Sequence, residues 1–384
     1  MPAGIFQRMI LGMGLVAPPD AEAVAALLVM GREAAGLTQG RLASRLSELA
    51  GAPISQGYVS KVEAGVLTVD PGRLPLFAAV LGLTPGLLAD TSATIWALGD
   101  GCDYQRKRAS TGVKAMRKLH ATLNLIRLAM VRLQAVAGLR EQPFLVTRTF
   151  VQGSTSAEDV ARAIRKQFQI PPGPLKSVTA LTEAAGAWVM TLPMGIREVD
   201  AASLHPADHV PLFVVNNDTS AERTRFSLAH ELGHAACQAR TGTEELTADR
   251  FASELLMPAK DILPELRQQT LSLARLRELK RRWRVSAAAL ARRSHDLGVT
   301  TDSNYRSLVI QMSGLGWKKN EPDSFDPERP IVVCEIVRAA LRSQGSISKL
   351  AEAAGTSTDQ FDRWFSASLV GQKSGGGFDV VDTA

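Results

Sequence analysis

Two stretches, His230-Glu231-Leu232-Gly233-His234 and Glu245-Leu246-Thr247-Ala248-Asp249, carry the strongest structural signal in the sequence. The first stretch lies in a helical pattern, and two histidines four positions apart share one helix face, about 40° apart around the axis. That spacing suits two ligands of one tetrahedral zinc ion. Glu231, beside the first histidine, can reach the open position of the metal and take a proton from water.

The second stretch predicts the third ligand. Glu245 and Asp249 are again four residues apart on a predicted helix. Glu245 completes a set of two histidines and one glutamate, which leaves a fourth position for water or substrate. Asp249 is expected to hydrogen-bond the outer ring nitrogen of His230 and to fix its tautomer. Glu244 is the alternative ligand, but it lacks the four-residue relation to Asp249.

Several neighbouring sequence segments resemble motifs of the ImmA/IrrE family of zinc metallopeptidases. They are Arg225-Phe226-Ser227-Leu228-Ala229 before the first stretch, Phe251-Ala252 after the second, and Leu255-Leu256-Met257-Pro258. The resemblance covers about residues 145–315 and implies an α+β, zincin-like domain. The interval between the two stretches is short for this family, so the loop that joins their helices must be tight.

Carried over residue by residue, the resemblance implies that His230, His234 and Glu245 bind Zn²⁺ and that Glu231 is the catalytic glutamate. A donor for the oxyanion that develops during peptide hydrolysis is also needed. The side chains considered for that role are His205, His209, Arg223 and Arg225. Cys237 follows His234 by one helical turn, and we interpret it as a small buried apolar residue.

The rest of this region alternates between strand and helix patterns. Short β-type runs occur at Thr147–Val151, Trp188–Leu192 and Leu212–Val215. The last of these could pair with an extended peptide or could simply be core. Helical patterns cover about residues 219–238, 245–256, 272–283, 286–297 and 302–314. Residues 320–330, rich in Pro, Asp and Glu, predict a linker.

Residues 21–92 predict five short helices, of which the second and third form a helix-turn-helix. Thr38 is a good N-cap for the second helix and Ser55 for the third. Val59 and Val62 face inward, and short polar side chains on the opposite side suit contacts to base edges. The residues predicted to bind double-stranded DNA are Gln39, Ser55, Gln56, Gly57, Ser60 and Lys61.

This segment resembles the lambda-repressor-like (XRE) helix-turn-helix family. The resemblance rests on Gly36-Leu37-Thr38-Gln39, on Leu42-Ala43 and on Ser55–Glu63. Here Ser47–Ile54 adds several residues between the two helices, which lengthens either the supporting helix or the turn. The resemblance implies a homodimer on DNA.

The remaining segments are a basic linker with a long helix, residues 96–142, and a small C-terminal helical unit, residues 331–367. Residues 96–142 carry nine basic and three acidic side chains and hold most of the net charge of +6. The helix could contact phosphates or cover the zinc domain. The C-terminal unit is similar to a second helix-turn-helix, and we expect it to pack rather than to read DNA.

Composition fits an ordinary globular chain in a reducing compartment. The three cysteines, Cys102, Cys237 and Cys334, form no CxxC pair, and no apolar run reaches the length that spans a bilayer. We therefore expect a cytoplasmic protein without a membrane partner. The expected fold is mainly α with a small β-sheet: an N-terminal five-helix helix-turn-helix domain followed by the α+β zincin-like metallopeptidase domain.

Two functions remain open from the sequence. In the first, the chain is a DNA-binding transcriptional regulator with an HExxH-type zinc metalloendopeptidase that hydrolyses a protein partner. Relatives fused behind an XRE module are typically regulators, and some cleave a partner repressor. In the second, the chain is a non-enzymatic transcription factor whose zinc domain is a scaffold or a ligand sensor.

Overall fold

The structure is a computed structural model that describes residues 21–90, 92, 102–104, 112–196, 199–206, 209–240, 242–318 and 320–369. Most of the predicted linker ahead of the long helix, including the basic run Arg106-Lys107-Arg108, lies outside the described residues. The chain divides into two compact units. The first joins Met1–Ile95, Arg117–Leu133 and Gln344–Arg363, and the second contains the rest.

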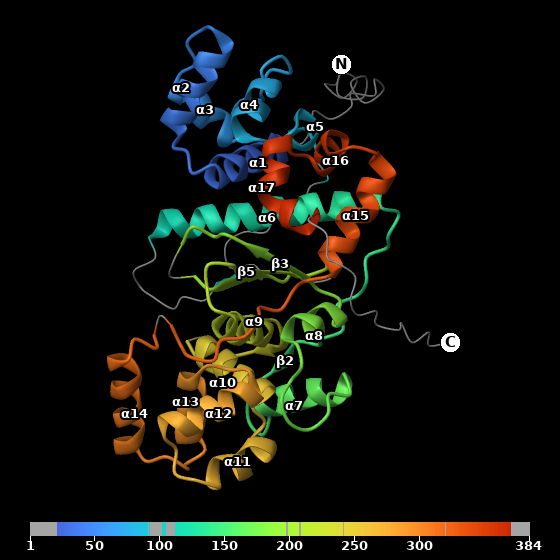
Figure 1. Ribbon diagram of the computed structural model, residues 1–384. Coiled ribbons are helices and arrows are strands. Elements are labelled where there is room, and N and C mark those ends of the chain that lie inside the picture. Colours follow the sequence, from blue (N-terminus) through green and yellow to red (C-terminus); the bar gives the residue numbers. More distant parts are fainter. Residues whose placement is uncertain are drawn as a thin grey trace, which may run out of the picture. The chain divides into compact units, whose positions relative to one another are not determined.

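The first unit begins with the five predicted helices (Figure 1). They are α1 (Ala21–Ala34), α2 (Gln39–Ala50), α3 (Gln56–Glu63), α4 (Leu74–Leu81) and α5 (Pro85–Leu88). The side chain of Thr38 accepts a hydrogen bond from Arg41 N and that of Ser55 accepts one from Tyr58 N, so both predicted N-caps are present. Val59 and Val62 are buried, as the pattern indicated.

The extra residues between α2 and α3 lengthen both α2 and the turn that follows it. α2 continues to Ala50, and Gly51 ends it in the left-handed conformation with φ 62°. The Ser47 hydroxyl then binds both the N–H of Ile54, at 2.8 Å, and its carbonyl, at 3.2 Å. This side chain closes the loop, and α3 therefore starts from a fixed position.

The C-terminal segment forms α15 (Val332–Gln344), α16 (Ile347–Ala354) and α17 (Thr358–Leu369). Within the first unit, the α16–α17 turn pairs with the α4–α5 turn through two reciprocal hydrogen bonds of 2.9 Å, from Thr84 N to Gly355 O and from Ser357 N to Gly82 O. A Cβ at position 355 would lie 2.9 Å from Cβ of Leu87, so glycine permits this close contact. The second helix-turn-helix-like segment thus packs on the first.

The long helix is α6 (Val113–Val136), whose middle third is buried on nearly every side. Lys114, Arg117 and Lys118 are exposed, but Arg127 is 2% exposed and Arg132 binds Asp90 at 2.5 Å. Two basic residues of this helix, Arg127 and Arg132, therefore face protein.

The second unit is built on a four-stranded sheet with the order β1-β4-β5-β3. Its strands are β1 (Cys102–Tyr104), β3 (Trp188–Leu192), β4 (Ala201–Leu204) and β5 (Leu212–Asn216). β3 and β5 are parallel, and the other neighbours are antiparallel. Since β5 pairs over five residues with β3 and over four with β4, neither of its sides is an edge, and the suggestion that Leu212–Val215 could pair with a peptide is wrong. A second, two-stranded sheet joins β2 (Thr149–Phe150) to β6 (Cys237–Gln238).

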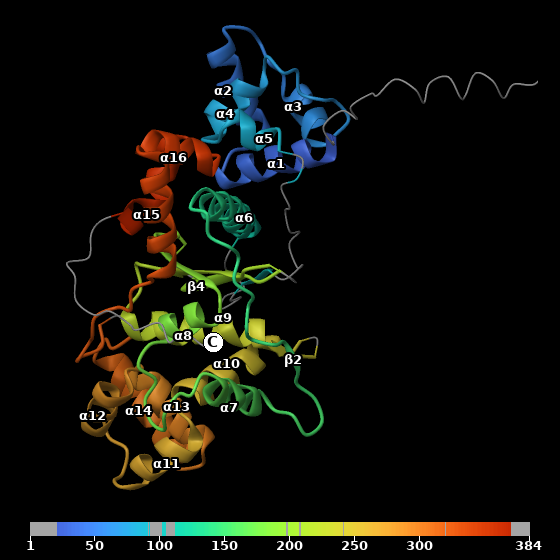
Figure 2. The same cartoon turned by 90° about the vertical axis from the view of Figure 1, so that its right-hand side faces the viewer.

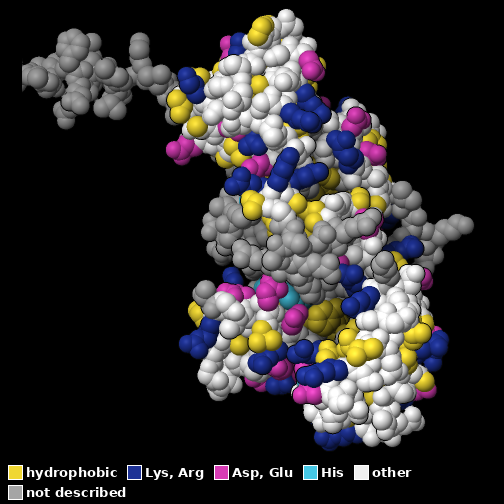
Figure 3. Space-filling model, turned by 90° about the vertical axis from the view of Figure 1, so that its left-hand side faces the viewer, with side chains coloured by type: hydrophobic (Ala, Val, Ile, Leu, Met, Phe, Trp, Pro, Cys, Tyr) yellow, Lys and Arg dark blue, Asp and Glu magenta, His cyan; other side chains and the backbone are white. Residues whose placement is uncertain are grey.

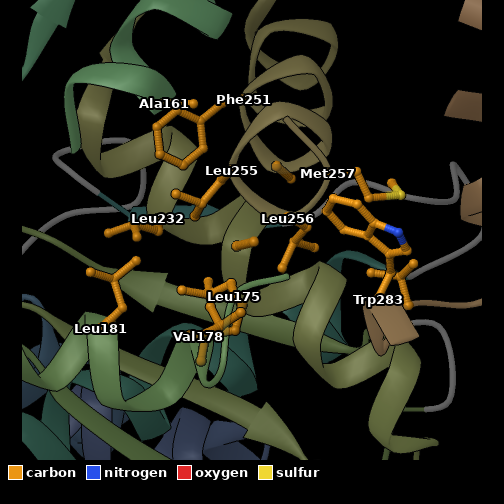
Figure 4. Close-up of a cluster of buried hydrophobic side chains, with 14 of the residues drawn as sticks. Ala161, Leu175, Val178, Leu181, Leu232, Phe251, Leu255, Leu256, Met257 and Trp283 are labelled. Carbon is orange, nitrogen blue, oxygen red and sulfur yellow. The ribbon is translucent and has the colours of Figure 1, made fainter. Parts of the chain in front are cut away.

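The helices of this unit pack below the sheet (Figures 1 and 2). They are α7 (Ala157–Gln167), α8 (Val178–Ala184), α9 (Ala221–Ala236), α10 (Glu244–Leu256), α11 (Ala259–Arg267), α12 (Leu273–Trp283), α13 (Ala287–Asp296) and α14 (Asp302–Gly314). Their shared core includes Leu232 of α9, Phe251 and Leu255 of α10 and Trp283 of α12 (Figure 4). The mainly α architecture with a small sheet is as predicted.

Residues 320–330 connect α14 to α15 without forming a helix or strand, as expected of a linker, and they are bound along this unit. The buried Lys280 ammonium binds Glu321 at 2.9 Å and Glu222 at 2.7 Å. Further along, Asp323 binds Arg277 at 2.6 Å, and Glu328 binds the buried Arg225. The acidic residues of this segment are thus partners of specific cations. Among the described residues, no helix combines the length and apolarity needed to cross a bilayer.

Candidate metal centre

The HExxH stretch lies on α9, the most buried helix of the second unit. His230 and Glu231 are 0% exposed and His234 is 5% exposed. Apolar neighbours in the same helix, such as Leu228 and Leu232, belong to the core and hold α9 between the sheet and α10. The two histidines therefore have few ways to move, which is a property of a prepared ligand site.

Gly233 sets the distance between the two helices that carry the site. A Cβ on this glycine would lie 3.0 Å from Phe251 Cδ1 and 3.1 Å from Cα of Ala248. α9 and α10 therefore approach closely where one helix has a glycine and the other an alanine. This contact brings Glu245, one turn before Ala248, next to the histidine pair.

The side chains of His230, His234 and Glu245 converge on one point, with ligand atoms all within 4.8 Å of one another. The two Nε2 atoms are 3.0 Å apart. Glu245 carboxylate oxygens lie 3.4 Å from Nε2 of His230 and 3.7 Å from Nε2 of His234. Ligands about 2.0–2.1 Å from a tetrahedral zinc ion lie roughly 3.3–3.4 Å from each other. The three side chains fit such an ion.

Asp249 lies where the sequence predicted it. Its Oδ1 is 2.7 Å from Nδ1 of His230, which directs Nε2 of that ring toward Glu245. Burial lowers the pKa of His230, but hydrogen bonds to Asp249 and Glu245 and the nearby Glu231 raise it to about 9. The same surroundings lower the pKa of Glu245, despite the opposing effect of its partial burial. The centre thus stabilises positive charge at the point of convergence.

One side of the centre is open. The side chains of Glu245 and Asp249 are 45% and 47% exposed. Solvent or a substrate can therefore approach the carboxylate side.

Ser203, which the sequence pattern did not predict as a site residue, contacts Glu231. The hydroxyl of Ser203, on β4, donates a hydrogen bond of 2.6 Å to Oε2 of Glu231. Both side chains are fully buried. Contact between a strand and a helix 28 residues apart has no signal in local spacing, although a polar residue on a buried strand could have drawn attention.

Other residues considered from the sequence lie elsewhere. Glu244 accepts a hydrogen bond from Gly242 N and is not in the converging set. Arg223 binds Asp200 and Arg225 binds Glu328, so the two arginines among the four side chains considered as oxyanion donors are engaged in ion pairs. Cys237 lies in the core, where burial raises the pKa of its thiol to about 12.

The two remaining histidines, His205 and His209, line a cavity of about 680 Å³. The cavity also includes Arg148, Pro211 and Ala235, the residue after His234. Through Ala235 the cavity borders the C-terminal end of α9, and the lining includes none of the three converging side chains.

The residues predicted to bind DNA lie together at the start of α2 and along α3. Ser55, Gln56, Gly57 and Lys61 are exposed, while Gln39 and Ser60 are partly exposed. Nε2 of Gln56 donates to Oε1 of Gln39 at 3.2 Å, and Nε2 of Gln39 donates to Glu63 at 2.9 Å. Figure 3 shows Lys and Arg side chains at several places on this unit.

Comparison with known families agrees with both resemblances. Residues 20–90 match the family model described as a helix-turn-helix domain. Residues 182–295 match that of the IrrE N-terminal-like domain, a metal-dependent peptidase family, and this range includes the whole converging set. The chain thus combines a DNA-binding helix-turn-helix domain with a metallopeptidase-like domain. Searches among curated proteins and among solved structures found no significant match.

Proposed function

We propose that the protein is a transcriptional regulator whose second domain is a zinc-dependent endopeptidase acting on a protein partner, such as a repressor. The observation that carries the proposal is the convergence of His230, His234 and Glu245 beside the buried Glu231. Two imidazoles and one carboxylate in tetrahedral spacing are a donor set that zinc prefers, and three protein ligands leave a position for chemistry.

Each residue of the centre has a distinct task in this proposal. Bound zinc would supply a Lewis acid that polarises the carbonyl of the scissile peptide bond. Glu231 accepts a proton from the attacking water and gives it to the departing amine. Ser203 holds the Glu231 carboxylate in place, and Asp249 holds the ring of His230.

In this proposal the helix-turn-helix domain directs the peptidase domain to specific DNA sites. α3 would lie in the major groove, with Gln56 and Ser60 at base edges and Lys61 at a phosphate. Gln39 and Ser55 would hold the start of α3 against the sugar-phosphate backbone of the DNA. Gly57 has no side chain and would permit a close approach of α3 to the DNA. We propose that the regulator binds DNA as a homodimer in the cytoplasm, where cleavage of a bound repressor changes transcription.

The test is a cleavage assay with a candidate repressor recovered by pull-down from the same cells. Zinc-loaded protein is expected to cut it, and Glu231→Ala is expected to lose cleavage while it retains zinc. Zinc without cleavage, together with DNA binding that Glu231→Ala leaves unchanged, would support the non-enzymatic scaffold or sensor instead.

A further inference from the structure

Strand β4 lies directly beside Glu231. Ser203, whose hydroxyl binds that glutamate, is the third residue of β4. On its inner side β4 pairs with β5. On its outer side it pairs with β1, antiparallel, in the register Cys102↔Leu204, Asp103↔Ser203 and Tyr104↔Ala202.

β1 is far from the rest of this sheet in sequence. It precedes α6, whereas the other three strands follow β2. It also contacts α9, the helix that carries His230 and His234. A three-residue segment of the chain's own backbone therefore lies along the one sheet edge that borders the metal centre.

A sheet edge binds an extended peptide through main-chain hydrogen bonds, which do not depend on peptide sequence. Such binding suits a peptidase, because an extended backbone presents its carbonyl groups at regular intervals. The opposite edge of the sheet, β3, is two strands farther from Ser203. Of the two edges, only that of β4 could hold a peptide next to Glu231.

We propose that the outer edge of β4 is the peptide-binding edge of this domain, and that β1 occupies it in place of an extended segment of the partner protein. The inference rests on the proposed peptidase function and names its substrate class. β1 has only three residues, so it forms few backbone hydrogen bonds, and a longer peptide can form the same ones. Beyond Leu204, the cavity lined by Arg148, His205 and His209 offers room for side chains of the incoming peptide.

The register supplies a direct test. Cys102 is native and lies opposite Leu204. Opposite residues of an antiparallel pair lie within the Cα separation that a disulfide accepts. In Leu204→Cys, mild oxidation is expected to link residues 102 and 204, which would hold β1 on the edge. Reduction would free it in the same sample, so any effect of the substitution itself on the fold cancels.

The probe is a dye-labelled peptide with the sequence of residues 98–108 and serine in place of Cys102. Its affinity is measured by fluorescence anisotropy with zinc-loaded Leu204→Cys protein that also carries Glu231→Gln, so no turnover is needed. We expect oxidised protein to bind at least tenfold more weakly than reduced protein. Protein with leucine at 204 should respond to neither treatment.

Proline variants of β1 give a second measurement. Successive N–H groups of a strand point to opposite sides, so either Asp103→Pro or Tyr104→Pro must remove a hydrogen bond to β4. One of them is expected to bind the probe several-fold more tightly. Ser154→Pro, in an exposed loop, is the matched control and should leave the affinity unchanged.

Two results would overturn the inference: a disulfide that does not form, or oxidised protein that binds the probe as well as reduced protein does. Failure of the proposed function looks different. Suppose that oxidised Leu204→Cys with intact Glu231 cleaves a partner as fast as the reduced protein does. That result would reject the peptide-binding edge and leave the peptidase function in place. Redox-dependent probe binding without any cleavage would retain the edge and reject the peptidase.

Discussion

The hydroxyl of Ser203 donates a 2.6 Å hydrogen bond to Oε2 of Glu231, which joins strand β4 to helix α9. A hydrogen bond to a charged group contributes about 1.5–3 kcal/mol. If Ser203 positions the catalytic glutamate, Ser203→Ala should lower kcat by about tenfold or more, with KM and zinc content unchanged. Equal kcat values for the two proteins would show that the bond only serves the fold.

Asp249 holds His230 by its Nδ1 atom, at 2.7 Å from the carboxylate. Removing such a partner of a metal-binding histidine typically lowers metal affinity 10–100-fold. We expect that loss in Asp249→Ala when zinc affinity is measured by competition with a chelating dye. Asp296→Ala, which removes a surface partner of Arg292, should bind zinc like wild type. An unchanged affinity in Asp249→Ala would contradict the assigned role.

Lys280 joins the segment 320–330 to the core, because its ammonium lies between Glu222 and Glu321. Lys280→Met leaves two carboxylates with no cation between them. We expect a loss of about 3–5 kcal/mol in the free energy of unfolding, measured with urea. Arg281→Met removes an exposed partner of Asp323 and should cost at most about 1 kcal/mol. If the two variants lose similar amounts of unfolding free energy, the buried cluster around Lys280 contributes no more to stability than an exposed ion pair does.

Glu183 gives the second unit a pH-dependent stability. Its carboxylate accepts hydrogen bonds from Ile331 N and Val332 N, and burial raises its pKa from 4.5 to about 7. The folded state then binds the proton more tightly than the unfolded chain does. Between about pH 4.5 and 7 this residue therefore lowers the free energy of unfolding as pH rises.

Glu183→Gln removes the charge and keeps an acceptor. It should unfold at a higher temperature than wild type at pH 8 and at a similar temperature near pH 4.5. Glu278→Gln, with a side chain 52% exposed, is the control and should show no such difference. A stabilisation of Glu183→Gln that is equal at both pH values would rule out titration of this carboxyl as the cause.

The reading face of α3 can be tested on DNA selected from random duplexes. Lys61→Ala should weaken binding to all sequences and reduce the slope of log affinity against log salt by about one. Gln56→Ala should instead relax preference at one base pair, at a cost of about 1–3 kcal/mol. Lys349 is exposed on α16, whose C-terminal turn pairs with the α4–α5 turn within the first unit, so Lys349→Ala should bind like wild type. A loss with Lys349→Ala would assign DNA contact to α16.

Local spacing explains what the sequence could predict. The four-residue intervals in His230–His234 and Glu245–Asp249 each define one face of a helix. Thr38 and Ser55 indicate the starts of the helices that they cap. Such relations need no knowledge of the distant chain. The helix-turn-helix, α9 and α10 could therefore all be predicted from the sequence.

Other elements depend on partners far along the chain. β4 (Ala201–Leu204) is rich in alanine, which has little strand preference, so only its pairing with β5 reveals it. α11 contains Pro264, a residue type that is unfavourable inside a helix. The acidic residues of 320–330 read as solvent-exposed until Lys280 and Arg225 are placed beside them.

The central claim is that His230, His234 and Glu245 hold one metal ion beside Glu231. Its most direct test is the zinc content per chain after purification without added metal, compared among wild type, His234→Ala and Glu231→Gln. We predict about one zinc ion per chain in wild type and Glu231→Gln, and little in His234→Ala. Wild type without stoichiometric metal, or His234→Ala with as much zinc as wild type, would contradict the account.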